Sequence, residues 1–180
     1  FPQFDKDQFL QGGFIKILPQ YIKKMISQNG IRNGVLNCIA PTGSISLLAH
    51  NVSSGIEPIY SLETKRKILT KQGEEETFFL EDYAYKLFKE IHTNACVPST
   101  FITATELGIE EHLQTQAVVQ HYIDGSISKT INCPQNLSMS ALENVYLRAY
   151  ELGCKGCTTY RKTEVRGSIF QDVKEEEYAC

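Results

Sequence analysis

Apolar residues recur at helical spacing in five segments of the chain, which predicts helices over residues 14–28, 44–49, 79–92, 106–122 and 140–152. In the first segment Pro19 suits a first helical turn and Gly30 suits a stop, so one or two short helices are expected there. In the last segment Ser140 and Glu143 have the spacing of a capping box, and Gly153 follows as the C-terminal stop.

Shorter apolar runs bounded by turn residues predict strands over residues 35–40, 101–104, 126–132 and 156–161. Residues 61–70 alternate moderately, which indicates an extended segment, and residues 71–76 are polar enough for a hairpin tip. Short strands that alternate with helices of these lengths indicate an α/β fold with parallel strands.

The composition excludes several classes of protein. A chain of 180 residues, 42% of them hydrophobic, can bury the core of one globular domain. The net charge of −3 gives no basic face for a nucleic acid, and no apolar run approaches the roughly 18 residues of a membrane span. The six cysteines are few and scattered, so we expect reduced thiols in a cytoplasmic protein.

The strand predicted over residues 35–40 leads into Pro41-Thr42-Gly43-Ser44-Ile45-Ser46, where a helix is expected to begin. The first amides of a helix lack partners within it and lie at the positive end of its dipole. Glycine lets the backbone approach an anion, and the threonine and serines add hydroxyl donors. Such a loop can bind a phosphate without a basic residue. The pattern leaves a simpler alternative open, in which Thr42 or Ser44 only caps the helix.

Four blocks of sequence resemble the adenosylcobalamin-dependent (class II) ribonucleotide reductases, in that family's order and approximate spacing. The blocks are R-N with I-A-P-T-G-S-I-S in residues 32–46, S-S-G-I-E-P at 53–58, Q-A with D and I-S-K-T-I-N in 116–132, and G-C-K-G-C-T-T-Y-R at 153–161. The di-iron (class I) enzymes differ in the loop, which usually lacks the glycine, and they carry a C-terminal tyrosine pair. The glycyl-radical (class III) enzymes need a C-terminal glycine motif that this sequence lacks.

The resemblance implies a fold and a site. The chain would be the C-terminal part of the ten-stranded α/β barrel of these enzymes, with residues 1–165 in the barrel domain and residues 166–180 as an acidic tail. Its loop would bind the substrate phosphates through backbone amides and hydroxyls of Pro41, Thr42, Gly43, Ser44, Ile45 and Ser46. Glu57, in the turn that follows, would either line this site or brace the turn by accepting backbone amides.

The resemblance also implies an activity. The intact enzyme would replace the ribose 2′-hydroxyl by hydrogen in thiyl-radical chemistry that adenosylcobalamin initiates. Its partners would be a ribonucleoside diphosphate or triphosphate, the remainder of the reductase chain and a thioredoxin-type reductant. We expect a homo-oligomer that binds neither nucleic acid nor membrane.

The residues of the radical chemistry are missing from this sequence. The family's N-P-C-G-E motif, which carries the radical cysteine, does not occur, and the partner cysteines of that motif have no counterpart. We therefore assign no catalytic residue and expect the isolated chain to be inactive, as a fragment or as one subunit of a split enzyme. The alternative is a stand-alone phosphate- or nucleotide-binding module.

Other chemistry-bearing residues have simpler interpretations. Cys154 and Cys157 form one C-x-x-C without the further ligands that zinc needs, so structural burial is favoured, and no metal site is expected. Lys129 would point into the barrel near the substrate or pair with a structural carboxylate. Cys38 and Cys133 are expected to be small core residues. Surface or helix-face positions are expected for the histidines, which are His50, His92, His112 and His121.

Overall fold

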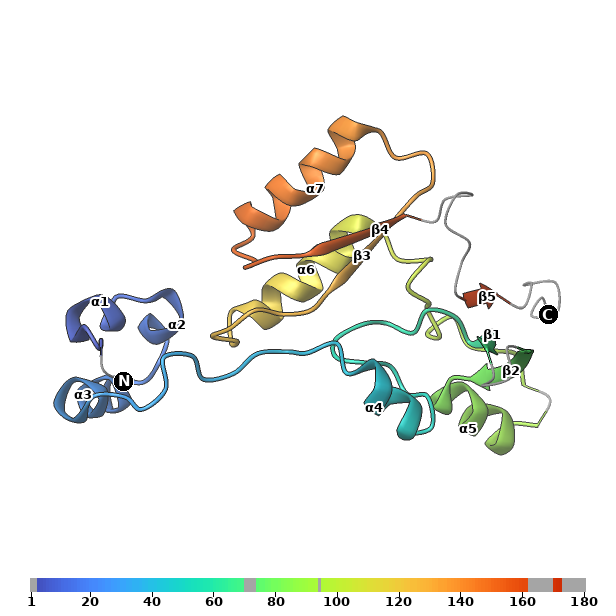
Figure 1. Cartoon of the computed structure of the whole chain (residues 1–180), viewed down its shortest axis with the longest axis horizontal. Helices are drawn as coiled ribbons and strands as arrows, with labels where there is room; N and C mark the ends of the chain where they lie inside the picture. Colours follow the sequence, from blue (N-terminus) through green and yellow to red (C-terminus); the bar gives the residue numbers. More distant parts are fainter. Residues whose placement is uncertain (1–2, 70–73, 94, 162–169, 173–180) are drawn as a thin grey trace.

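The computed structural model describes residues 3–69, 74–93, 95–161 and 170–172. Three short helices, α1 (Lys6–Leu10), α2 (Gly13–Lys16) and α3 (Gln20–Asn29), form a group at one end of the molecule (Figure 1). Gly30 ends α3 with a φ of 74°, as the sequence predicted, whereas Pro19 is the N-cap of this helix and lies one residue before its first turn. An extended segment leads from this group to the rest of the chain (Figure 1).

The main core lies between two helices and two parallel strands. Strand β3 (Thr130–Cys133) pairs in parallel with β4 (Thr158–Arg161), and the chain between them forms helix α7 (Met139–Glu151). Helix α6 (Ile109–Gln120) packs beside α7 and against β3. The buried cluster that joins these elements consists of Leu113, Ile131, Val145 and Ala149. This β–α–β arrangement is the crossover that parallel strands require, and it confirms the α/β prediction.

A hairpin forms the other end of the molecule. Strand β1 (Glu63–Leu69) pairs antiparallel with β2 (Glu75–Glu81), and β5 (Phe170–Asp172) pairs with the opposite edge of β1. Helix α5 (Tyr83–Ile91) follows β2 after a single residue, Asp82, whose side chain caps it. The extended segment predicted over residues 61–70 is therefore mostly strand β1, while residues 70–73 and most of the predicted tail lie outside the described residues.

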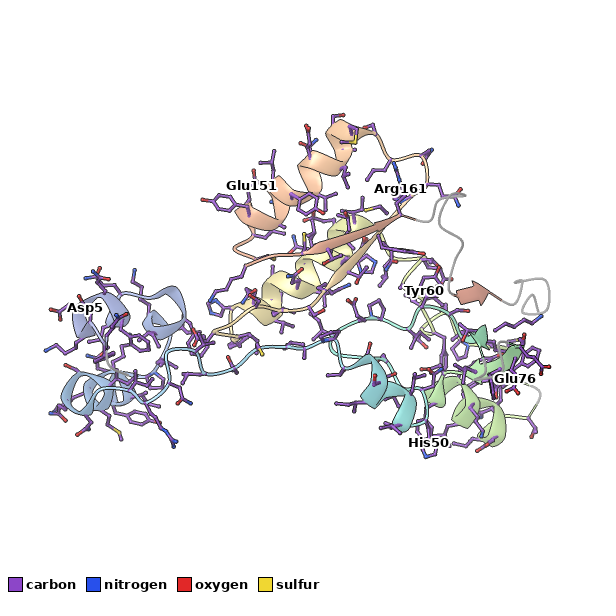
Figure 2. The ribbon with its side chains drawn as sticks, viewed as in Figure 1. Asp5, His50, Tyr60, Glu76, Glu151 and Arg161 are labelled. Atoms are coloured by element: carbon purple, nitrogen blue, oxygen red, sulfur yellow. The ribbon has the colours of Figure 1, made fainter. Side chains whose placement is uncertain are left out.

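Helix α4 (Gly43–Leu48) lies near the hairpin end and follows a short contact with the parallel sheet. Ile39 forms a parallel bridge with Ile127: its amide donates to the Ser126 carbonyl at 3.1 Å, and its carbonyl accepts from the Ser128 amide at 2.8 Å. In Figure 2, His50 marks the end of this region, far from Asp5 in the first helical group. The bridge places the start of α4 beside the parallel strands.

Two predicted strands are wrong. Residues 35–40 contribute only the bridge at Ile39, and Val35 and Leu36 are 63% and 45% exposed, so this apolar run lacks the burial that predicted a strand. Residues 101–104 form a loop, in which the Ala104 amide donates to the Ile59 carbonyl at 2.7 Å.

Two predicted helix starts also need correction. The helix predicted from residue 79 begins at Tyr83, because Phe79 pairs with Lys65 across the hairpin and belongs to β2. Helix α7 is capped by Ser138, which accepts from the Ala141 amide at 3.2 Å, and not by Ser140. Within the described part of the chain, no helix has both the length and the apolar composition of a membrane span.

Candidate functional site

The loop at residues 40–46 leads from the isolated bridge at Ile39 into helix α4, so the predicted helix start is confirmed although the predicted strand before it is not. Thr42 is the N-cap residue of α4, but its side chain makes no capping bond to the helix. Its Oγ1 instead accepts a hydrogen bond of 2.9 Å from the Gly55 amide, in the following turn. Ser44 lies inside the first turn of α4, so the alternative of a plain side-chain cap is wrong for both residues.

Some hydrogen-bond donors of this loop already have partners within the protein. The Ser46 hydroxyl donates to the Val52 carbonyl, and the Ser46 amide donates to the Thr42 carbonyl at 2.9 Å. The expected donation from Ser46 to a phosphate therefore does not fit the geometry. The amides of Gly43, Ser44 and Ile45 occupy the first turn, where a helix offers no carbonyl partner, and these three residues are exposed.

The two glycines near the loop differ in what a side chain would meet. A Cβ at Gly43 would have no atom within 4 Å, so the space on the Cβ side of this residue is open. A Cβ at Gly55 would lie 3.0 Å from the Ala40 carbonyl oxygen, and Gly55 has a φ of +59°. Gly55 thus allows the turn to pack on the loop, whereas Gly43 leaves the helix start accessible.

A cavity of about 560 Å³ opens beside the start of α4. Gly43, Ser44 and Ser46 form part of its wall, and Glu57 lies on the wall as well. The parallel strands contribute three further polar residues, Thr130, Asn132 and Tyr160, and Tyr60 comes from the segment before the hairpin. Figure 2 shows Tyr60 between the strand end at Arg161 and the hairpin. No sequence pattern singled out Tyr60, Asn132 or Tyr160 for this site, although Asn132 and Tyr160 lie near the ends of predicted strands.

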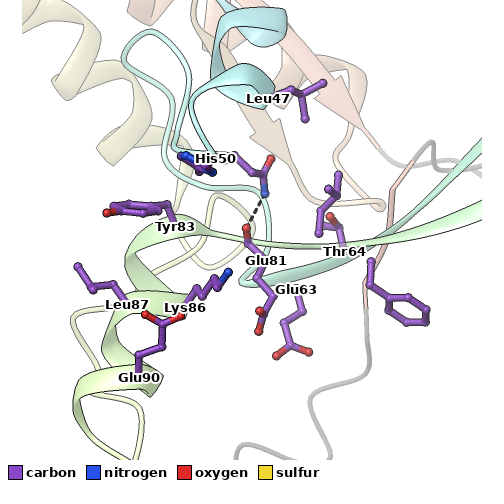
Figure 3. Close-up of a pocket in the computed structure, with 12 residues that line it drawn as sticks. Leu47, His50, Glu63, Thr64, Glu81, Tyr83, Lys86, Leu87 and Glu90 are labelled. Atoms are coloured by element: carbon purple, nitrogen blue, oxygen red, sulfur yellow. Dashed lines mark hydrogen bonds between the residues drawn. The ribbon is translucent and has the colours of Figure 1, made fainter.

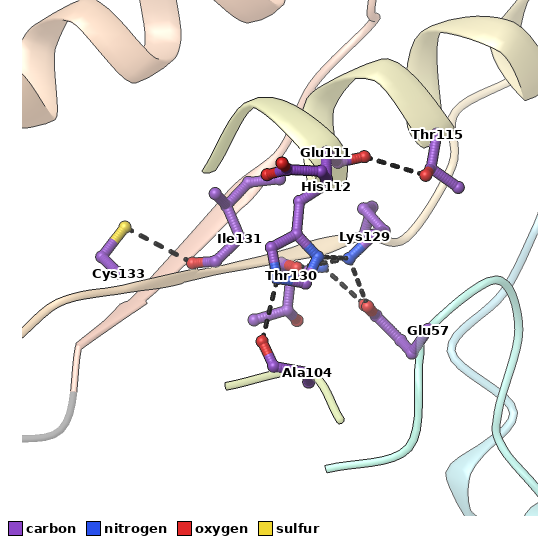
Figure 4. A network of polar contacts seen from close by, with 9 residues as sticks. All are labelled: Glu57, Ala104, Glu111, His112, Thr115, Lys129, Thr130, Ile131 and Cys133. Carbon is purple, nitrogen blue, oxygen red and sulfur yellow. Dashed lines mark hydrogen bonds and ion pairs between the residues drawn. The ribbon is translucent and has the colours of Figure 1, made fainter. Parts of the chain in front are cut away.

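Glu57 joins a buried polar network behind this cavity (Figure 4). Its Oε1 accepts from the Thr130 amide at 2.5 Å, and its Oε2 lies 2.7 Å from Lys129 Nζ. The same ammonium group lies 2.9 Å from His112 Nδ1. Glu57 thus lies on the cavity wall and accepts a backbone amide from β3, which ties its turn to the parallel strands. Lys129 pairs with a carboxylate, which is one of its two predicted roles.

His112 is the residue of this network that the sequence did not single out. It lies on α6, is 1% exposed, and its Nε2 lies 3.1 Å from the Ala104 carbonyl oxygen. Burial, and then the positive charge of Lys129, hold the pKa of His112 below its usual value of 6.5. The other three histidines, His50, His92 and His121, are exposed, as predicted.

A second cavity, of about 660 Å³, lies between the hairpin, α5 and the end of α4 (Figure 3). Apolar and charged side chains share its wall, among them Leu47, Glu63, Tyr83 and Lys86. The Asn51 side chain donates to the Glu81 carbonyl at 3.0 Å across it. No sequence motif pointed to this cavity.

Three cysteines lie beside the main core of the molecule. Cys154, Cys157 and Cys133 pack against the main core, and burial raises the pKa of each thiol. The described residues include no group of three or more histidine, cysteine or acidic side chains that could hold a metal ion. Cys38 is exposed rather than a core residue, and Cys96 is disulfide-bonded, so the prediction of six reduced thiols is wrong at Cys96.

Comparison with known proteins settles the family. The model of the ribonucleotide reductase barrel domain matches residues 16–160 of the chain. The chain belongs to the ribonucleotide reductase family. A vitamin B12-dependent ribonucleoside-diphosphate reductase of Thermoplasma acidophilum is 34% identical over 164 residues, and one of Mycobacterium tuberculosis is 26% identical over 173 residues. These matches cover 81% and 86% of the chain but only 21% and 25% of the relatives, so the chain spans about a quarter or less of their length.

Solved structures agree on the fold of this ribonucleotide reductase segment. A B12-dependent (class II) ribonucleotide reductase superposes with a TM-score of 0.58 at 17% identity and covers 97% of the chain and 26% of its own. The alpha subunit of an Actinobacillus ureae class Id enzyme gives a TM-score of 0.54 at 24% identity, covering 78% of the chain and 29% of its own. The described elements within residues 16–160 therefore belong to the reductase barrel domain.

Proposed function

We propose that this chain works as part of a ribonucleotide reductase and that residues 41–46 bind the phosphates of its ribonucleotide substrate. The observation that carries the proposal is the first turn of α4. Its residues Gly43, Ser44 and Ile45 are exposed and their amides have no helix partner, and Gly43 and Ser44 line a cavity of about 560 Å³. Membership of the reductase family supports the nature of the ligand. The loop supplies backbone donors at the positive end of a helix dipole, which suits a dianionic phosphate.

The donor set is narrower than the sequence predicted. Pro41 has no amide proton, and the donors of Ser46 are used within the loop, so these two residues shape the site. The hydroxyl of Ser44 and the amides of residues 43–45 are the groups that would meet the ligand. Thr42 accepts from Gly55 and keeps its own hydroxyl proton for donation.

The reaction of the intact enzyme is the replacement of the ribose 2′-hydroxyl by hydrogen, with thiols as the reductant. The names of the relatives support adenosylcobalamin as the radical source in the intact enzyme. We assign none of the described residues to the cobalamin. Further proposed partners are a ribonucleoside diphosphate or triphosphate, the remainder of the reductase, a thioredoxin-type reductant and a second copy, in the cytoplasm.

Binding of ADP to the 180-residue chain, measured by calorimetry, tests the phosphate site. Gly43→Val should weaken binding at least about tenfold, or 1.4 kcal/mol, because a branched side chain would occupy the open space on the Cβ side of this residue in the first turn. Gly13→Val is the matched control, since Gly13 also begins a short helix and its Cβ would meet nothing within 4 Å. Equal ADP affinity in both variants would overturn the site.

A further inference from the structure

Lys129 satisfies three acceptors at once while almost fully buried. The residue is 2% exposed, and its ammonium contacts Glu57 Oε2 at 2.7 Å, His112 Nδ1 at 2.9 Å and the Thr130 carbonyl at 2.5 Å. An ammonium group has three protons, so each contact takes one. His112 Nδ1 must then be an acceptor, and its Nε2 carries the proton that is donated to Ala104. A buried charge is tolerated when it is paired in this way.

Glu57 connects this buried group to the turn over residues 53–57. Its carboxylate holds Lys129 and the Thr130 amide, and its own amide donates to the Ser54 carbonyl at 2.9 Å. Gly55 in the same turn donates to Thr42 Oγ1 at 2.9 Å and packs on the Ala40 carbonyl. The turn is therefore tied to β3 on one side and to the loop on the other.

The loop needs such support, because Thr42 has a left-handed backbone with a φ of 53°. That conformation is strained for a β-branched residue and persists only where the surroundings enforce it. The bond from Gly55 is the tertiary contact that the Thr42 side chain makes. Loss of order in the turn would release Thr42 and move the amides of residues 43–45.

We propose that Lys129 is a positioning residue of the phosphate site, which it holds in its binding geometry through Glu57 and the turn over residues 53–57. This inference rests on the proposed phosphate-binding function. Lys129 does not touch the ligand, because it lies behind Glu57 and is not part of the cavity wall. Its effect is to fix the shape of the loop before the ligand arrives.

The arrangement makes the site sensitive to the protonation of His112. Three charged groups face His112: Lys129, which directly precedes β3, Glu57 in the turn, and Glu111 on α6 itself. A proton on Nδ1 would remove the acceptor of Lys129 and place two cations side by side. The network would open, and anion binding would weaken as the pH falls.

The first test compares Lys129→Met with Lys89→Met in the 180-residue chain. Lys89 is also an ion-paired lysine, but its partners, Glu63 and Glu81, lie on the hairpin strands and not in the turn over residues 53–57. Lys129→Met should weaken ADP binding about five- to tenfold at pH 7.5 and should speed amide exchange in residues 53–57, since the turn loses its anchor. Lys89→Met should change neither value. Wild-type affinity and wild-type exchange in folded Lys129→Met would overturn the proposal.

The second test uses His112→Asn, which keeps an acceptor near the position of Nδ1 and cannot titrate. Sulfate is the probe, because it neither gains nor loses a proton between about pH 5.5 and 7.5, the range in which histidine titrates. The sulfate affinity of the wild-type chain, followed by the amide resonances of residues 43–45, should fall as the pH drops below 6.5, whereas the affinity of the variant should stay level. If sulfate affinity falls equally in the wild-type chain and in His112→Asn, the proposal is overturned. This comparison decides the proposal even if Lys129→Met fails to fold.

These results separate the two proposals. If the wild-type chain binds neither ADP nor sulfate, the phosphate function fails, and amide exchange in Lys129→Met alone decides whether Lys129 holds the turn. If the wild-type chain binds ADP and Gly43→Val does not, the function stands whatever the Lys129 and His112 variants show.

Discussion

Single residues decide whether the loop can keep its shape, and Gly55 is the one with the least tolerance. Its φ of +59° disfavours any side chain, and a Cβ would approach the Ala40 oxygen to 3.0 Å. Gly55→Ala should therefore lower the free energy of unfolding by about 1–3 kcal/mol in urea titrations. Gly156→Ala is the control, because a Cβ there would meet nothing within 4 Å. A cost at Gly55 no larger than at Gly156 would contradict the packing described.

The titration of His112 should affect stability as well as binding. Burial and the charge of Lys129 keep the pKa of His112 below 6.5 in the folded chain. Below pH 6.5 the unfolded chain therefore binds more protons than the folded chain, so stability is complete above this pH and is lost as the pH falls toward the folded pKa. Urea midpoints at about pH 7.5 and 5.5 measure this loss, which should be smaller in His112→Asn. Identical losses in the two proteins would show that His112 does not carry the pH dependence.

Among the elements, helix starts offer a sharp test because sequence and structure assign different caps to α7. The Ser138 hydroxyl accepts from the Ala141 amide, whereas Ser140 contacts only the Ser138 hydroxyl. Ser138→Ala should cost about 1 kcal/mol of unfolding free energy, in the usual range for an N-cap, and Ser140→Ala should cost a few tenths. Thermal melting of both variants measures the difference. A larger cost at Ser140 would restore the capping box that the sequence predicted.

The sequence predicted elements well where the signal was local. Pro19 and Gly30 mark the ends of α3, and the P-T-G-S stretch marks the start of α4, because backbone restriction at proline and glycine acts within a few residues. Phe79 was assigned to a helix because the apolar residues from 79 onward also fit a helical period, but pairing with Lys65 makes it a strand residue. The capping preference of Asp82 was the local signal that could have placed the start of α5 correctly.

Local sequence patterns could not predict the polar network of Glu57, Lys129 and His112 behind the cavity. Lys129 meets Glu57 across 72 residues of sequence and meets His112 across 17, so only the fold brings them together. The sequence is compatible with two roles for each of Glu57 and Lys129, because one sequence alone does not show which residues become neighbours. Contacts of this range depend on how β3, α6 and the turn pack, which helical and strand periodicity does not encode.

At the scale of the whole molecule, several apolar side chains around the second cavity stay exposed to solvent. Leu47, Phe79, Tyr83 and Leu87 all line this cavity, and they are 41%, 72%, 44% and 39% exposed. Scattered exposed hydrophobic residues are normal, but these four share one hollow, and together we call them the apolar patch. Burial of such a patch against another surface is favourable, since it removes apolar area from water.

The isolated 180-residue chain should therefore self-associate through this patch, with an average mass that rises with concentration in sedimentation velocity. Phe79→Ser combined with Leu87→Ser should reduce association, because both side chains contribute to the same hollow. Tyr150→Ser is the control, since Tyr150 is 81% exposed on α7 and lies outside the patch. Mass action requires association to weaken on dilution, so a mass that stays monomeric over about a fortyfold range of concentration would refute the prediction. Association that persists in the double variant and is lost in Tyr150→Ser would move the contact surface from the hairpin to α7.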